Sequence, residues 1–110
     1  MFFGGEIVSR KSLETLTETM FYVLMALYRA ERCGTEIAAY ITEKTKGRLR
    51  LGPGTLYTIL AGFEDKDLIE ETAVEGRKRT YRITAKGSAI YDEELERLRK
   101  CVADAEGEDA

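Results

Sequence analysis

The sequence contains no histidine among its 110 residues. Histidine is the commonest general base in enzymes, so its absence argues against acid–base catalysis. The glycines form neither a Walker-type nor a dinucleotide-binding pattern, and the two cysteines, Cys33 and Cys101, lack the spacing of a metal site. We therefore expect a protein that is not an enzyme and that needs no cofactor and no metal.

Proline, cysteine and long apolar runs are also scarce. Pro53 is the only proline and 34% of the residues are charged, which favours helices with a solvated surface over a β-sandwich. Two cysteines are too few for a disulfide scaffold, so we expect a reduced, cytoplasmic chain. No apolar run approaches the roughly 18 residues of a membrane span. The N-terminus lacks the apolar core of a secretory signal, so we expect neither signal nor membrane contact.

Charge is unevenly distributed along the chain, although the net charge is only −3. Residues 44–86 carry ten basic and six acidic side chains, whereas residues 92–110 carry eight acidic and three basic ones. A basic middle beside an acidic end is found on ordinary solvated surfaces and also on nucleic-acid-binding segments. Charge alone does not favour either interpretation.

Apolar periodicity predicts three helices in the first half of the chain. Helical spacing over residues 15–28, stopped by Gly34, predicts the first helix. Thr35 is a plausible N-cap of a second helix that ends at Gly47. Pro53 fits the first turn of a third helix. Its buried stripe consists of Leu56, Ile59, Leu60 and Phe63 at i, i+3, i+4 and i+7.

The second half of the chain predicts a hairpin and a last helix. Alternating residues predict strands from Leu68 to Val74 and from Arg79 to Thr84, joined by a turn at residues 75–78. Thr84 can cap a last helix over residues 85–103, in which Gly87 is a mild cost. The predicted fold class is mainly α with a small β-hairpin, in the order α-α-α-β-β-α of a winged helix-turn-helix.

Two features inside this order point to DNA. The first turn of the third helix is small and polar, so its backbone can approach closely and its free N–H groups can bind phosphate. The turn of the hairpin carries Arg77, Lys78 and Arg79, which can straddle phosphates or enter the minor groove. Each feature alone is more often structural, as a helix start with a half-buried Tyr57 or as a basic surface turn. Together, at the separation that a wing requires, they favour DNA binding.

The residues expected to contact DNA come from the second helix, the loop after it, the third helix and the hairpin turn. They are Thr35, Arg48, Arg50, Gly52, Gly54, Thr55, Tyr57, Thr58, Arg77, Lys78 and Arg79. Tyr57 and Thr58 fall outside the buried stripe of the third helix, so their hydroxyls can reach phosphates or bases.

The last helix carries a short apolar seam with spacings of four, three and four residues. The seam is too short for a free-standing coiled coil, so it packs either on the chain's own first helix or on a partner chain. The first helix has apolar residues on more than one face, and surplus apolar surface favours a partner. The residues expected at the dimer interface are Leu16, Met20, Tyr91, Leu95, Leu98 and Val102.

Three ordered segments resemble the PadR family of winged-helix transcriptional regulators, in particular its small subgroup with a single C-terminal helix. They are Gly54-Thr55-Leu56-Tyr57 with Leu60, Phe63, Glu64 and Leu68-Ile69; Gly34-Thr35-Glu36-Ile37; and Arg79-Thr80-Tyr81-Arg82-Ile83-Thr84-Ala85-Lys86-Gly87. The chain departs from the family pattern at three positions: Thr58 replaces the usual proline, Asp67 replaces the usual glycine, and Thr35 replaces the common tyrosine.

The resemblance implies a homodimer that binds a two-fold operator in double-stranded DNA and represses nearby genes. It also implies relief of repression by a small-molecule effector, often a phenolic compound. The sequence has no tryptophan, so an effector cannot be held between tryptophan rings. The alternative is a winged-helix protein-interaction module without DNA binding. Such modules often lack a basic wing tip, so residues 77–79 favour DNA.

These expectations divide the chain into four parts. Residues 1–12 are predicted to form a flexible arm, residues 13–86 the winged-helix DNA-binding domain, residues 87–103 the dimerisation helix, and residues 104–110 an acidic disordered tail.

Overall fold

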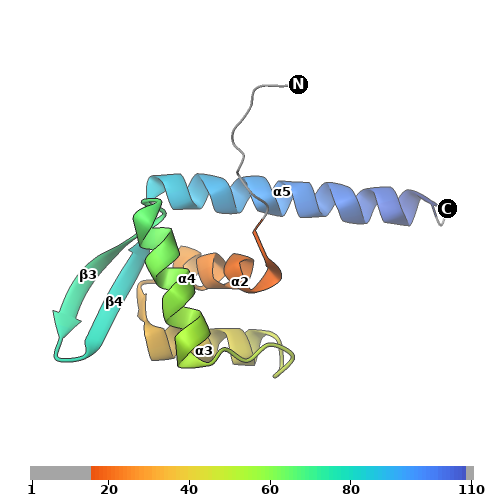
Figure 1. Cartoon of the computed structure of the whole chain (residues 1–110). Coiled ribbons are helices and arrows are strands. Elements are labelled where there is room, and N and C mark those ends of the chain that lie inside the picture. Colours follow the sequence, from red (N-terminus) through yellow and green to blue (C-terminus); the bar gives the residue numbers. More distant parts are fainter. Residues whose placement is uncertain (1–15, 109–110) are drawn as a thin grey trace.

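The computed structural model describes residues 16–108, in which four helices pack together and a small sheet extends from one side of them (Figure 1). The predicted arm at residues 1–12 and the last two residues of the predicted tail lie outside the described residues. The described helices include none long and apolar enough to cross a membrane.

The first described helix, α2 (Glu18–Arg29), begins at an N-cap, Thr17, whose hydroxyl accepts a hydrogen bond from the Met20 N–H at 3.1 Å. Helix α3 (Gly34–Lys44) follows after a short connection. The predicted boundary between them was wrong: Gly34 begins α3 instead of stopping α2, and the N-cap is Cys33 instead of Thr35. The physical reason is a capping box, in which the Glu36 carboxylate accepts the Cys33 N–H at 2.8 Å.

Helix α4 (Pro53–Asp65) starts at the proline as predicted and buries one stripe of side chains. Leu56, Leu60 and Phe63 are each at most 3% exposed, whereas Tyr57 and Thr58 are exposed. The buried stripe packs into a core shared with α2 and α3, which contribute Val23, Leu24, Ile37 and Ile41.

The sheet has three antiparallel strands rather than the two of the predicted hairpin. Strands β3 (Ile69–Glu75) and β4 (Lys78–Ile83) form the wing, with Gly76 at φ +62° in its turn. A two-residue strand, β2 (Arg32–Cys33), pairs with the other edge of β4, so β4 is the central strand. Two residues before β3, Asp67 takes φ +62°, a left-handed conformation that aspartate adopts more readily than most residues. The turn is therefore retained without the family's glycine.

Helix α5 (Ala85–Glu108) is longer than predicted. The Thr84 hydroxyl accepts the Gly87 N–H at 3.0 Å, as expected of an N-cap. At the other end, the prediction that residues 104–108 are disordered was wrong, because the helix continues through them. Alanine and glutamate, which make up most of this segment, are strong helix formers, and that preference outweighs the acidic charge.

The first half of α5 covers α2, and the second half extends past the body of the molecule (Figure 1). Tyr91 lies in the core, 3% exposed, and stacks on Phe21 with ring centroids 5.0 Å apart. Its ring also contacts Tyr28 at 4.6 Å between centroids. Burial raises the pKa of the Tyr91 hydroxyl. Within α5, Tyr91 therefore belongs to the chain's own core.

Candidate nucleic-acid interface

The wing tip and the N-terminal end of α4 lie at the same end of the molecule, opposite α5 (Figure 1). Between them runs a groove that joins three elements. Its walls come from the start of α3, from Tyr57 on α4 and from the basic residues of the wing. The lining residues are Cys33, Gly34, Thr35, Glu36, Tyr57, Arg77, Lys78 and Arg79. The structure thus brings together five of the predicted DNA contacts, Thr35, Tyr57 and the three wing cations.

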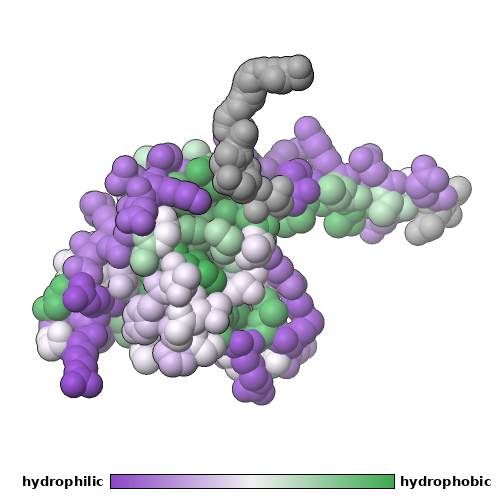
Figure 2. Space-filling view, in the orientation of Figure 1, coloured by the Kyte–Doolittle hydropathy of each residue, from purple (hydrophilic) through white to green (hydrophobic). Residues whose placement is uncertain are grey.

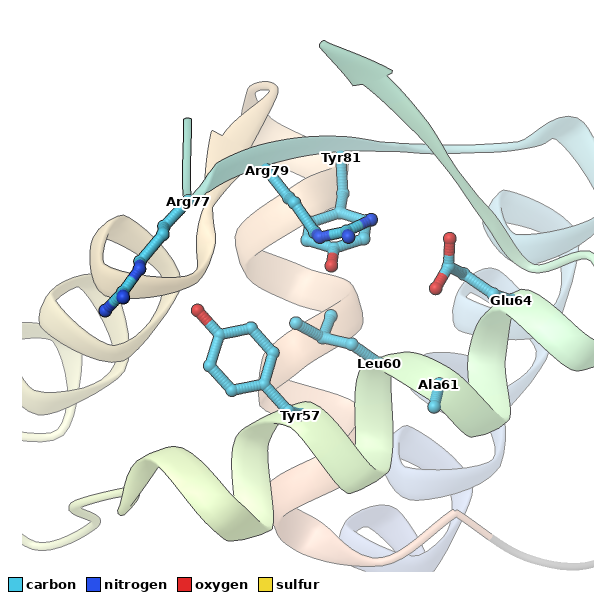
Figure 3. Close-up of a pocket in the computed structure, with 7 residues that line it drawn as sticks. All are labelled: Tyr57, Leu60, Ala61, Glu64, Arg77, Arg79 and Tyr81. Atoms are coloured by element: carbon cyan, nitrogen blue, oxygen red, sulfur yellow. The ribbon is translucent and has the colours of Figure 1, made fainter. Parts of the chain in front are cut away.

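A second groove continues between α4 and β4 (Figure 3). Helix α4 supplies Tyr57, Leu60, Ala61 and Glu64, and the wing supplies Arg77, Arg79 and Tyr81. Tyr57 and the two arginines line both grooves, so Tyr57 stands at their junction. Tyr81 is 3% exposed and forms the floor, where burial raises the pKa of its hydroxyl.

The three wing cations differ in how they are paired. The Arg79 guanidinium donates to the Glu71 carboxylate at 2.7 Å, and this hydrogen bond raises the pKa of Arg79. Arg77 and Lys78 form no ion pair with any of residues 16–108. They are therefore the two wing cations that need not break an existing ion pair to meet an anion.

The start of α3 places a carboxylate inside the same groove. Glu36 is held by the N–H of Cys33, and this backbone hydrogen bond is the main cause of its lowered pKa. The Cys33 thiol lies 3.3 Å from the Thr35 hydroxyl and is 6% exposed. Glu36 therefore organises the start of the helix through its hydrogen bond to the Cys33 N–H. Its negative charge would repel a phosphate rather than bind one.

The first turn of α4 presents little bulk to solvent. Gly52, Gly54 and Thr55 are exposed, and a Cβ added at either glycine would meet nothing within 4 Å. The Thr58 hydroxyl donates to the Gly54 carbonyl of its own helix at 2.9 Å, which leaves its oxygen free to accept a hydrogen bond. This turn is open to a close approach by a ligand backbone.

Two predicted contacts lie away from the groove. Arg48 in the loop before α4 donates to Glu18 at 2.7 Å and to the Tyr22 hydroxyl at 3.2 Å, both on α2. The hydrogen bond to Glu18 raises the pKa of Arg48. Arg50 lies against Gly47 in the same loop. The loop therefore ties Arg48 to α2, and neither arginine lines the two grooves.

Three residues that line the first groove are not among the contacts predicted from the sequence, and the second groove adds Leu60, Ala61, Glu64 and Tyr81. Cys33, Gly34 and Glu36 line the groove because β2 holds the start of α3 beside β4. A two-residue strand has no periodicity that a sequence could reveal. The available signal is the segment Gly34-Thr35-Glu36-Ile37, which enters the sequence analysis only as part of the family resemblance.

The predicted dimer residues lie in three environments. Leu16, Met20, Leu95 and Leu98 are half-buried against the core, and Tyr91 is enclosed in it. Val102, 55% exposed, lies on the extended half of α5. Figure 2 shows a hydrophobic strip along this half of the helix, and Leu95, Leu98, Val102 and Ala103 line a shallow surface groove there. The burial of Tyr91 in its own chain contradicts its assignment to a dimer interface.

The model of the transcriptional regulator PadR-like family matches residues 23–93. The chain belongs to this family. PadR-like proteins are regulators of transcription rather than enzymes, in agreement with the expectation from the sequence.

Solved structures support the same fold. A transcriptional regulator from Clostridium thermocellum is 27% identical, with a TM-score of 0.69 over 90% of this chain and 97% of that one. A PadR family regulator from Clostridium difficile is 19% identical, with a TM-score of 0.74 over 86% and 100%. Bacillus subtilis PadR, solved with operator DNA, is 21% identical, with a TM-score of 0.61 over 69% of this chain and 45% of that longer one. The predicted winged-helix fold is thus confirmed.

Proposed function

We propose that this PadR-like chain is a sequence-specific DNA-binding repressor that acts as a homodimer. The observation that carries the proposal is the groove in which Tyr57 lies beside Arg77, Lys78 and Arg79, next to the open first turn of α4. Cations and helix N–H groups bind backbone phosphates, and a helix that begins with small residues can enter the major groove. Bacillus subtilis PadR, which shares the fold, binds operator DNA.

Within this interface we assign separate roles to the two elements. Thr55, Tyr57 and Thr58 on α4 position the protein or read bases, and the wing cations contact phosphates. Arg48 has a smaller role, because its guanidinium is already engaged by Glu18 and Tyr22.

The homodimer is proposed from α5. The strip formed by Leu95, Leu98 and Val102 runs from the edge of the core, where the two leucines are half-buried, to the exposed Val102 on the half of α5 that leaves the body. Surfaces of this kind mark association sites, and a second copy offers the same strip. A dimer of this type predicts a two-fold operator with half-sites one helical turn of DNA or more apart. Relief of repression by a small, phenolic molecule is proposed from the family resemblance.

The proposal is tested by selecting bound duplexes from a random pool, with and without a panel of phenolic compounds. We expect enrichment of an inverted repeat and its loss with an active effector. Enrichment of a single asymmetric site would contradict the dimer, and failure to enrich any duplex would contradict DNA binding. The Tyr57→Phe variant serves as a probe of the site, because the Tyr57 hydroxyl that it removes forms no hydrogen bond within residues 16–108.

A further inference from the structure

The first residue of α3, Gly34, lies against the hydroxyl end of the Tyr57 side chain from α4. A Cβ at position 34 would lie 2.6 Å from the Tyr57 Oη, 3.0 Å from its Cζ and 3.3 Å from its Cε1. Gly34 is not among the glycines with positive φ, so its backbone accepts an alanine. The three atoms nearest to a side chain at this position therefore all belong to Tyr57.

The position of that ring depends on this contact more than on any polar bond. Tyr57 is 46% exposed and its hydroxyl has no hydrogen-bond partner within residues 16–108. The backbone beneath it is fixed, because Leu56 and Leu60 on either side are buried. Contact with the start of α3 consequently sets where the hydroxyl points in the groove, close to Arg77 (Figure 3).

We infer that Gly34 is a positioning residue for DNA recognition: it gives Tyr57 the place from which its hydroxyl reaches the DNA. This inference rests on the proposed function. An alanine at position 34 must push the hydroxyl away by roughly 0.8 Å, the step from 2.6 Å to ordinary contact at 3.4 Å. The fold tolerates this shift because the displaced atom is the free end of a half-exposed side chain. A hydrogen bond tolerates it poorly, because its strength depends steeply on geometry.

The experiment is a double-mutant cycle on the duplex that the wild-type protein selects from a random pool. We expect Gly34→Ala to weaken binding roughly 3- to 10-fold, the equivalent of one hydrogen bond. In a Tyr57→Ala background, the same alanine should change affinity less than about twofold. Gly107→Ala is the matched control, because a Cβ there meets nothing within 4 Å. The melting temperature of Gly34→Ala should equal or exceed that of the wild type, because alanine favours a helix.

Each other outcome overturns the inference. Equal loss of affinity in both backgrounds would mean that Gly34 acts without Tyr57, and no loss in the wild-type background would mean that it does not act. Unfolding of Gly34→Ala that is rescued by Tyr57→Ala would make the contact a structural one. If the wild type binds its duplex and Gly34→Ala binds it equally, only this inference fails. If the wild type enriches no duplex, the proposed function fails with it.

Discussion

The carbonyl oxygen of Leu68 occupies the space that a Cβ at Gly87 would need. The same Cβ would lie 2.8 Å from the Ile83 Cγ1, so the first turn of α5 has no room for any side chain at this position. The Leu68 oxygen also accepts the Thr84 N–H at 3.0 Å, which holds the end of β4 and the start of α5 against the start of β3. Gly87 is therefore required for the junction of wing and helix. The sequence predicted only that this glycine slightly lowers the stability of the helix.

The first prediction is that Gly87→Ala destabilises the domain by about 1–3 kcal/mol, because backbone must move to accommodate the methyl group. Gly62→Ala is the matched control in the interior of α4, where a Cβ meets nothing within 4 Å. It should stabilise the domain by roughly 0.5–1 kcal/mol. Urea unfolding measures the stability of both variants. If Gly87→Ala were as stable as Gly62→Ala, the backbone at the junction would move without a loss of stability.

The second prediction concerns the two wing cations without an ion pair. Arg77→Gln with Lys78→Gln should weaken binding to any duplex and reduce the magnitude of the log–log salt slope by about 1.8, because each phosphate that is no longer neutralised accounts for about 0.9. Arg82→Gln with Lys86→Gln removes the same charge elsewhere. Arg82 pairs with Glu70 at 2.5 Å on the strand face opposite Tyr81, so its replacement should leave the slope nearly unchanged. A double wing variant with the wild-type slope would rule out a phosphate clamp.

The third prediction concerns the extended half of α5. Leu98→Asp with Val102→Asp should yield a folded monomer, because each aspartate would bring an unpaired charge into the interface. Val102 is 55% exposed in the single chain, and Leu98 is only partly buried against the core. Lys100→Asp changes the net charge equally but lies on the other side of the helix, so it should leave a dimer intact. Sedimentation equilibrium distinguishes the two. A dimeric double variant would place the interface elsewhere.

The fourth prediction concerns pH and the capping box of α3. The pKa of Glu36 is lowered from its ordinary value of 4.5 by its bond to the Cys33 N–H. The ionised group therefore adds stability above that value, and this contribution disappears as the pH falls through the lowered pKa. Glu36→Gln should melt earlier than the wild type at neutral pH, and the difference should shrink on acidification. Glu43→Gln, on the same helix but without a side-chain hydrogen bond within residues 16–108, should show no such trend.

The periodic elements were predictable from the sequence because each buries a continuous stripe. The stripe of Leu56, Ile59, Leu60 and Phe63 and the cap at Thr84 are local patterns. The structure retains both, with Ile59 only partly buried. Tyr91 could not be assigned correctly, because a core position and a dimer seam have the same helical spacing. Its partner Phe21 is 70 residues away in the sequence, so the pairing depends on tertiary packing.

The composition of the site was predictable only in part. The cations of the wing and the first turn of α4 are visible as local composition. The contribution of Gly34 and Glu36 depends on β2, whose two residues carry no periodic signal. The length of α5 beyond residue 103 was missed because acidic charge was given more weight than the helix preference of alanine and glutamate.

Strand β2 has a consequence for the cost of binding. Its pairing of Arg32 with Tyr81 and of Cys33 with Thr80 joins the start of α3 to the central strand of the wing. The distance between these two walls of the groove is thus set during folding, and little conformational entropy remains to be lost when a ligand arrives. A duplex would meet a preorganised surface, in which Thr55, Tyr57 and Thr58 discriminate between sequences and the wing cations supply affinity for the phosphate backbone.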